Sequence, residues 1–352
     1  MAVLVRSKGE TWGALRLSKV GLVSQGREGI LSPPLVAADG VYIDEWYETA
    51  EVVKLHRQTL EAIWRVKTRE GPGPGGGLSP LRMWSDDLIL MGGQDRIGMM
   101  EADSGRLRWA VSEASGPLVW NRRVVVKSKA AVLLIDGLTG ATTDRYPLAA
   151  KGASTLCGDR LVVLPEDDDW ISSLELGTGK VMWRRELLRE MGDFARFDFK
   201  TNAIGLVAGS RPTSVVATRG PVVFGLSVED GSIRWGAPVA VTYYWPNVHD
   251  GRIYVLLMDH FVCLDEATGE IVYDVQHPQL AEAFLPQTGT IYGAKIAFAM
   301  ETGHLAVFDL TNGRLVWLYK HKLKLGRTAE VDGRLLATTD DGHLLVFEDR
   351  GR

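Results

Sequence analysis

Short apolar runs separated by polar turns occur along the whole chain. In segments such as PLVAADGVYID (34–44), TLCGDRLVVL (155–164) and AEVDGRLLAT (329–338), an apolar run leads through a Gly-containing turn into another apolar run. An Asp-Gly turn between alternating runs is typical of a β-hairpin. In HLAVFDL (304–310) both alternating faces are apolar. We therefore expect sheets that are packed between two neighbouring sheets rather than solvated on one face.

One phrase recurs after these hairpins, a Gly followed four residues later, in most copies, by a large aromatic residue. Its copies are SGRLRW, TGATTD, TGKVMW, DGSIRW, TGEIVY and NGRLVW, which end at Trp109, Asp144, Trp183, Trp235, Tyr273 and Trp317. A degenerate first copy, TLEAIW, ends at Trp64 and has Leu60 in place of the Gly. Successive copies lie 35 to 52 residues apart. This period fits a blade of four short strands in a β-propeller better than a solenoid repeat.

The Gly and aromatic positions of the phrase have different physical roles. We expect the Gly to lie in a tight turn at positive φ, a conformation that only Gly adopts without strain. The Thr, Ser, Asp or Asn before it can form hydrogen bonds with the turn backbone. We expect the large ring four residues later to fill the gap between neighbouring sheets.

The last copy of the repeat is incomplete. GHLLVFEDRGR (342–352) aligns with residues 303–313, and the chain then ends before a fourth strand. An open sheet edge would be a liability, so we expect AVLVR (2–6) or WGALRL (12–17) to pair with the last blade and close the ring. The prediction is a single all-β domain over 1–352, an eight-bladed β-propeller in which segment 1–20 completes the blade 326–352. Seven blades are the alternative, if the first copy is something else.

The phrase x-D-x-x-T-G-x-x-x-W resembles the repeat of the pyrroloquinoline-quinone-like, or quinoprotein-like, β-propellers over most of the chain. The resemblance implies the fold, whereas members of that family differ in function. They include quinone-dependent alcohol dehydrogenases, a lipoprotein that assists outer-membrane barrel assembly, and sensor domains of kinases. The chain is similar in length and blade count to the barrel-assembly lipoprotein type, without the signal and lipidated Cys of that type.

The resemblance does not extend to the dehydrogenase chemistry. Those enzymes resemble one another in two features. A pair of adjacent cysteines lies against the cofactor, and a calcium ion is held by Glu, Asn and Asp side chains. Here the two cysteines, Cys157 and Cys263, are far apart, and the calcium motif is not found. We therefore do not expect quinone-dependent oxidation, and we expect no cofactor.

Composition narrows the possible partners and compartment. The 352-residue chain has a formal net charge of -4, which argues against a nucleic-acid binder. It contains no apolar run of membrane-spanning length. Its first residues, MAVLVRSKGETWGALRL, lack the apolar core of a secretory signal. We expect a cytoplasmic protein, with a processed exported form as the alternative.

No catalytic signature occurs in the sequence. There is no G-x-S-x-G, H-E-x-x-H, Walker loop or Cys/His zinc spacing, so we assign no catalytic residue and no metal. Strand C of each blade should begin thirteen residues before the end of the phrase. The residues there are Glu51, Arg96, Ala131, Trp170, Val222, His260, His304 and, by alignment, His343. We interpret the histidines as structural, with convergence on a metal as the alternative.

The loops from strand B to C and from strand D to the next A open on one face of such a blade, and we expect that face to bind a protein partner. The loops DEWYET (44–49) and PEDDDWI (165–171) place aromatic residues among acids, as protein interfaces do. An insertion at 184–202 has apolar residues at helical spacing and predicts a short amphipathic helix. The predicted partner-binding residues are Trp46, Tyr47, Trp170, Leu188, Phe194, Tyr244 and Trp245.

The alternative function is an enzyme or a small-molecule sensor with a site at the mouth of the central channel. Its candidate ligand-binding groups are Arg96, Asp168, Arg219, Asp259, His260 and Glu301, all on expected B–C loops. The sequence favours the non-enzymatic scaffold because it carries a repeated frame with no motif for chemistry.

Overall fold

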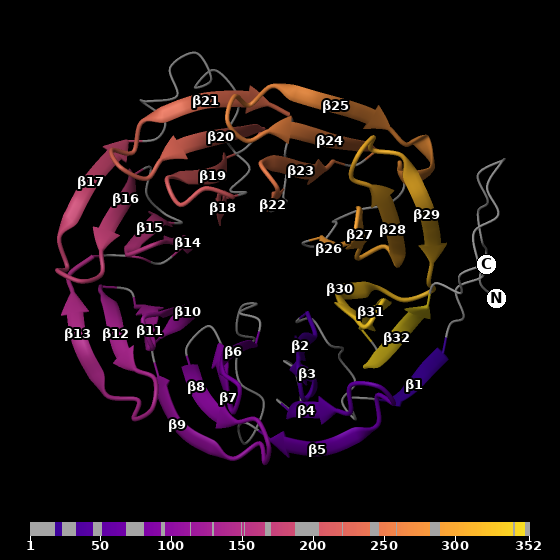
Figure 1. Ribbon diagram of the computed structural model, residues 1–352, viewed down its shortest axis with the longest axis horizontal. Coiled ribbons are helices and arrows are strands. Elements are labelled where there is room, and N and C mark those ends of the chain that lie inside the picture. The colour runs from indigo at the N-terminus through magenta and orange to yellow at the C-terminus, as the bar shows by residue number, and fades with distance from the viewer. Residues whose placement is uncertain are drawn as a thin grey trace. The chain divides into compact units, whose positions relative to one another are not determined.

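A computed structural model of the chain describes the residues from 18 to 348 except 23–32, 45–50, 68–80, 93–95, 113, 129, 149, 151, 166–169, 187–203, 220, 240–245, 258, 282–288 and 341. These residues form eight four-stranded antiparallel sheets (Figure 1). The fold is an all-β, eight-bladed β-propeller, which confirms the expected class and the count of eight rather than seven. The only helix in the described ranges is the 3-10 helix η2 (Pro278–Leu280).

The chain divides into two compact units. The first comprises Met1–Pro117, Asp136–Ala141 and Gly289–Arg352, and the second comprises Leu118–Ile135 and Thr142–Thr288.

Four sheets belong to the first unit. Their strands are β2 (Leu35–Ala37), β3 (Gly40–Asp44), β4 (Glu51–Leu55) and β5 (Ala62–Lys67); β6 (Arg82–Ser85), β7 (Leu88–Gly92), β8 (Arg96–Glu101) and β9 (Leu107–Ser112); β26 (Thr290–Tyr292), β27 (Lys295–Ala299), β28 (His304–Asp309) and β29 (Leu315–Lys320); and β30 (Leu325–Val331), β31 (Arg334–Thr339), β32 (His343–Glu348) and β1 (Ser18–Leu22).

The other four sheets lie wholly or mostly in the second unit. Their strands are β10 (Ser115–Trp120), β11 (Arg123–Lys127), β12 (Val132–Asp136) and β13 (Thr142–Tyr146); β14 (Gly152–Cys157), β15 (Arg160–Pro165), β16 (Trp170–Glu175) and β17 (Val181–Glu186); β18 (Ile204–Ala208), β19 (Ser214–Arg219), β20 (Val222–Ser227) and β21 (Ile233–Pro238); and β22 (Asn247–His249), β23 (Arg252–Leu256), β24 (His260–Asp265) and β25 (Ile271–Gln276).

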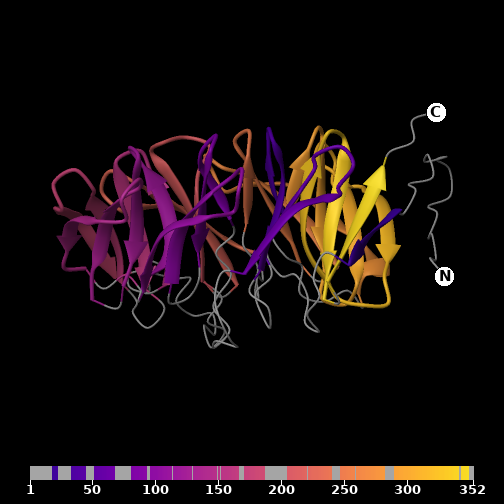
Figure 2. The same cartoon turned by 90° about the horizontal axis from the view of Figure 1, so that it is seen from below.

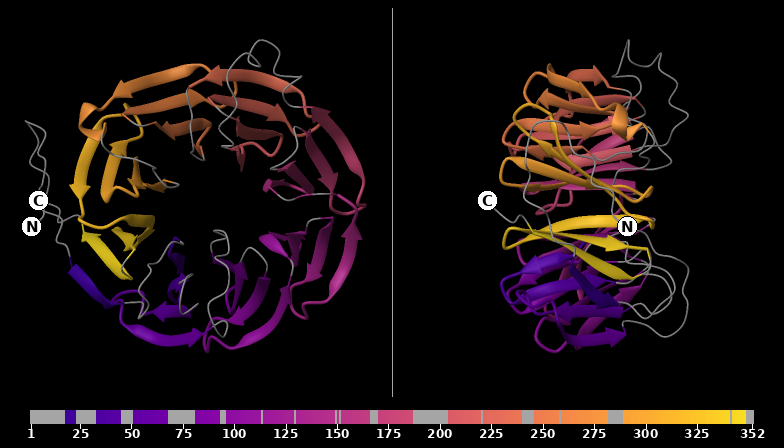
Figure 3. Two further views of the ribbon diagram at one scale, coloured as in Figure 1. Left: turned by 180° about the vertical axis from the view of Figure 1, so that it is seen from behind. Right: turned by 90° about the vertical axis from the view of Figure 1, so that its right-hand side faces the viewer.

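An N-terminal strand completes the last sheet, as expected from the missing fourth strand. β1 pairs antiparallel with β32, with Ser18 opposite Val346 and Val20 opposite Leu344, and Figure 3 shows it beside that sheet. The pairing strand is therefore Ser18–Leu22 and neither of the two stretches named from the sequence. Those stretches, 2–6 and 12–17, lie outside the described residues.

Strand order places the connections of each sheet at two opposite edges. Because neighbouring strands run in opposite directions, the A–B and C–D turns share one edge, and the B–C connection and the end of strand D share the other (Figure 2). We call these the turn edge and the loop edge. The expected starts of strand C are correct for seven sheets, and in the third sheet β12 begins at Val132, one residue after Ala131.

The turn glycines have the predicted conformation. φ is +69° at Gly105, +71° at Gly179, +75° at Gly231 and +73° at Gly269. Leu60, which replaces the Gly in the first copy, has φ +59°, and its N–H donates to the His56 carbonyl at 2.8 Å in the same turn pattern. Leu60 is also buried in the core of the first unit, so burial of its side chain offsets the strain.

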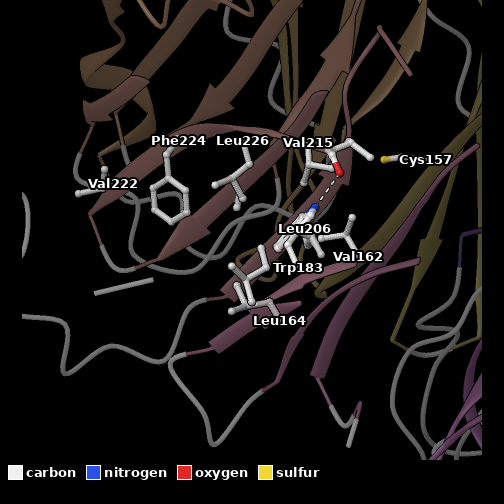
Figure 4. Close-up of a cluster of buried hydrophobic side chains, with 12 residues drawn as sticks. Cys157, Val162, Leu164, Trp183, Leu206, Val215, Val222, Phe224 and Leu226 are labelled. Carbon is white, nitrogen blue, oxygen red and sulfur yellow. Dashed lines mark hydrogen bonds between the residues drawn. The ribbon is translucent and has the colours of Figure 1, made fainter. Parts of the chain in front are cut away.

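The tryptophan rings link consecutive sheets, as the sequence predicts. The indole N–H of Trp183 donates to the Val228 carbonyl at 2.8 Å, and that of Trp235 to the Glu266 carbonyl at 3.0 Å. Trp183 belongs to a core formed by sheets β14–β17 and β18–β21, with Leu206 and Phe224 (Figure 4). Each ring thus fills the space between two sheets and satisfies a turn carbonyl.

In the third copy of the phrase, a different residue fills the space between the two sheets. Asp144, at the aromatic position, forms an ion pair with Arg123 at 3.0 Å. Two residues later, the hydroxyl of Tyr146 donates to the Leu176 carbonyl at 2.8 Å, and its ring lies where a side chain on Gly179 would be. The linking role has moved to Tyr146, which alignment of the phrase did not identify.

Candidate functional site

Many residues predicted for the loop edge lie outside the described residues. These are Trp46, Tyr47, Asp168, Leu188, Phe194, Tyr244 and Trp245. The predicted helix within 184–202 falls there as well, except that Arg184–Glu186 belongs to strand β17.

Trp170 is the described member of the predicted partner-binding set. It is the first residue of β16 and is half-buried, and the guanidinium of Arg184 on the paired strand β17 lies 4.8 Å from its ring centre. A cation over an indole face stabilises both side chains by about 0.5–1 kcal/mol at an exposed site. The loop edge therefore presents a fixed aromatic surface at this sheet.

Of the channel-mouth candidates, Asp259 and His260 lie together. His260 Nδ1 is 2.7 Å from Asp274 Oδ1 on β25, and its Nε2 is 3.8 Å from Asp259 Oδ1. Asp259 also accepts a hydrogen bond from Gln276 Nε2 at 2.9 Å. These contacts join strands C and D of one sheet, so they hold its loop edge together.

The remaining candidates occupy strand ends or a short connection. Arg96 begins β8 and is exposed, and Arg219 ends β19. Glu301 lies between β27 and β28, with its carboxylate 3.7 Å from Lys324 Nζ.

The histidines and cysteines have local roles. His304 is buried and its Nδ1 lies 2.8 Å from Thr302 Oγ1. Cys157 and Cys263 are free and buried, and burial raises the pKa of each thiol to about 11. In the described part of the chain no group of three or more His, Cys, Asp or Glu residues is placed to hold a metal ion. The described residues also include no helix that is long and apolar enough to span a membrane.

A buried lysine at the loop edge is absent from the sequence predictions. Lys127 ends β11, is 8% exposed, and its ammonium group donates to the Gly152 carbonyl. Burial lowers the pKa of this group from 10.5 to about 8, because the charged form loses its hydration. The lysine side chain appears in the strand pattern only as the polar end of RVVVK, so its burial could not be inferred from the sequence.

This pKa predicts a pH dependence of stability. Between pH 8 and 10.5 the unfolded chain binds the Lys127 proton more tightly than the folded chain does, so stability should rise with pH by about 3 kcal/mol from this group. Below pH 8 its contribution should be constant. Urea unfolding of wild type and Lys127→Met at several pH values should show this rise in wild type alone.

The comparison cancels the other groups that titrate nearby. The two cysteine thiols act in the opposite direction above about pH 9 in both proteins, because their folded pKa values are raised. Lys320→Met, at an exposed position, is the control for loss of a charge alone. Equal slopes for wild type and Lys127→Met would contradict the assignment.

The described residues also form a pocket at the turn edge, which the sequence did not indicate. It has a volume of about 240 Å³ and lies between sheets β18–β21 and β22–β25 of the second unit. Arg211, Arg234, Arg252, Asp265 and Glu266 are among its lining residues.

Comparison with known proteins agrees with this geometry. The family model described as outer membrane protein assembly factor BamB matches residues 48–190 and 167–351. The chain belongs to the BamB family. No curated protein sequence matches it.

Three solved structures have a fold similar to that of this chain. BamB from Moraxella catarrhalis superposes with a TM-score of 0.66 at 16% identity, over 96% of this chain and 99% of that one. The computationally designed Ika8 protein gives 0.71 at 13% identity, over 92% and 97%. The quinohemoprotein alcohol dehydrogenase from Comamonas testosteroni gives 0.62 at 11% identity, over 93% and 75%. At these identities the similarity shows the fold alone. The expected family resemblance is confirmed by the match to the family model.

Proposed function

We propose that this BamB-family protein is a non-enzymatic scaffold that binds a protein partner through the loop edges of its sheets. The observation that carries the proposal is family membership over both halves of the chain, in a family described by an assembly factor. A regular frame of eight four-stranded sheets is suited to presenting loops rigidly.

The loop edge supports the proposal chemically. Trp170 stands at this edge with an arginine over its ring, and Trp and Arg are the residue types most enriched at energetically important interface positions. The acidic segments that flank the loop edge in the sequence would favour a partner with basic side chains. The partner-binding role of Trp46, Tyr47, Leu188, Phe194, Tyr244 and Trp245 stays a prediction, as does a cytoplasmic location.

Site-specific photo-crosslinking in the native host tests which edge meets a partner. A photoreactive residue at Arg96 or Gln276 stands at the loop edge of its sheet, and one at Asp103 or Glu270 stands at the turn edge of the same sheet. All four positions are exposed, so each pair is a matched control. We expect discrete protein adducts from Arg96 and Gln276, with little or none from Asp103 and Glu270.

Two other crosslinking outcomes would contradict the proposal. Adducts only from the turn-edge positions would overturn the choice of edge. The absence of protein adducts from all four positions, with the chain folded as judged by circular dichroism, would contradict the scaffold proposal. Fractionation of the same cells tests the expected cytoplasmic location.

A further inference from the structure

The turn-edge pocket is built around a buried carboxylate that departs from the repeat. Glu266 is the first residue after strand β24 and is 6% exposed. The corresponding residues in five other sheets are apolar: Ala102, Gly137, Leu176, Val228 and Leu310. A buried carboxylate costs several kcal/mol in desolvation unless it is well hydrogen-bonded, so an apolar residue would be the simpler filler here. Its presence requires an explanation beyond packing.

Glu266 holds the facing turn of the neighbouring sheet in place. Both of its carboxylate oxygens accept the Ser210 N–H at 3.0 Å, and Oε1 accepts the Ser214 hydroxyl at 2.5 Å. The Ser210 hydroxyl in turn accepts the N–H of Gly251 at 3.0 Å. A side chain on Gly209 would collide with Ser214 Oγ and Glu266 Oε1, at 1.9 and 2.2 Å. The network therefore fixes the turn on both sides of Arg211.

The carboxylates of the pocket that lie nearest the network are already occupied by protein donors. Asp265 accepts Arg252 Nη1 at 2.6 Å and the N–H groups of Ala267 and Thr268 at 3.0 and 3.1 Å. Asp250 is strongly exposed and lies 3.5 Å from His249. Because Asp265 and Glu266 have their oxygens satisfied, a cation would gain little by binding there.

The guanidinium groups of the pocket, unlike these carboxylates, keep N–H donors that no protein acceptor uses among the described residues. Arg211 and Arg234 line it, are exposed, and form no ion pair with any residue in the described ranges. Arg252 uses Nη1 for Asp265 and keeps further N–H groups. A guanidinium presents five donors in a planar fork that matches a carboxylate or a phosphate. The unused hydrogen-bonding capacity of the pocket is thus cationic and donor-rich.

The size of the pocket limits what it can take. A volume of about 240 Å³ lies below the roughly 300–1,000 Å³ of pockets for drug-sized ligands. It is large enough for a single oxyanion with a small attached group.

We propose that the turn-edge pocket binds the oxyanion group of a small ligand, a carboxylate or a phosphate, through Arg211 and Arg234. In this site Glu266 is a positioning residue that acts on Arg211 through Ser210 and Ser214. The site lies at the opposite edge of the sheets from the proposed protein-binding loops, so it is independent of the scaffold function.

NMR titration of the arginine side-chain N–H signals tests the proposal, with inorganic phosphate and acetate as separate probes. We expect saturable shifts with a dissociation constant on the order of 1 mM for one of the two probes. The double variant Arg211→Gln/Arg234→Gln should weaken that binding at least tenfold. Arg145→Gln, an exposed arginine in the same unit, removes charge away from the pocket and should leave the affinity unchanged within twofold.

The two probes separate the sources of the oxyanion. Saturation by phosphate alone assigns the site to a phosphate group, and saturation by acetate alone assigns it to a carboxylate. Equal weakening by the double variant and by Arg145→Gln would show nonspecific charge attraction and overturn the proposal. Absence of saturable shifts with either probe would overturn it as well. Arg211 and Arg234 are exposed, so circular dichroism should show the double variant folded.

Discussion

Replacing Trp183 by alanine should lower the free energy of unfolding by about 3–5 kcal/mol. The side chain is 8% exposed and belongs to the core shared by sheets β14–β17 and β18–β21. The substitution removes a large ring from between two sheets and leaves the Val228 carbonyl without its indole donor. Urea unfolding followed by far-ultraviolet circular dichroism measures the change without relying on the fluorescence of the altered residue.

Two control variants separate the contributions of Trp183. Trp183→Phe keeps most of the ring and removes the N–H donor, so it should cost less than the alanine variant, by at least about 1 kcal/mol. Ile63→Ala, at a side chain that is 50% exposed, should cost less than about 1 kcal/mol. A loss below about 1 kcal/mol for Trp183→Ala would show that the ring does not link the sheets.

The second large effect is expected at the glycine that the Trp183 ring covers. Gly231 has φ +75°, and a side-chain carbon there would lie 2.5 Å from Trp183 Cε3 and 2.7 Å from Cδ2. Gly231→Ala should therefore combine backbone strain of about 1–2 kcal/mol with overpacking of about 1–3 kcal/mol. The buried ring cannot move aside without disturbing its hydrogen bond to Val228.

Gly333 provides a matched control for the backbone part of this effect. Its φ of +76° is nearly the same, and a side-chain carbon there would have no atom within 4 Å. Gly333→Ala should cost only the strain, about 1–2 kcal/mol. Urea unfolding of the two variants gives the difference directly. Equal losses would mean that the ring does not restrict Gly231 and that only the turn conformation matters.

The repeated frame could be predicted from the sequence because it depends on local chemistry. A turn that needs positive φ favours Gly, and a gap between sheets favours a large ring, so most copies of the phrase carry both residue types. The start of strand C follows from the same spacing, as at Glu51, Trp170 and His260. Leu60 is an exception to this rule, because its backbone adopts the positive φ expected of Gly while its side chain packs in the core.

The turn-edge site could not be predicted because its parts look ordinary along the chain. DEATGE, which contains Glu266, reads as one more turn phrase, and Ser210 and Ser214 read as polar residues of another turn. They are more than 50 residues apart from Glu266 and meet only because two sheets are neighbours. The exchange of Asp144 for Tyr146 was missed for a similar reason, because a ring two residues later reaches the same gap.

The sequence by itself determined the all-β class, the eightfold repeat, the turn glycines, the linking tryptophans and the need for an N-terminal strand. Each of these is set by a spacing or by a residue type that local backbone geometry demands. Only the tertiary structure decided that Ser18–Leu22 is the closing strand and that Lys127 is buried. It also decided that Glu266 orders a turn beside two arginines that form no ion pair with the described residues. The physical reason is that burial and pairing between sheets depend on which distant segments become neighbours, and no local pattern records that.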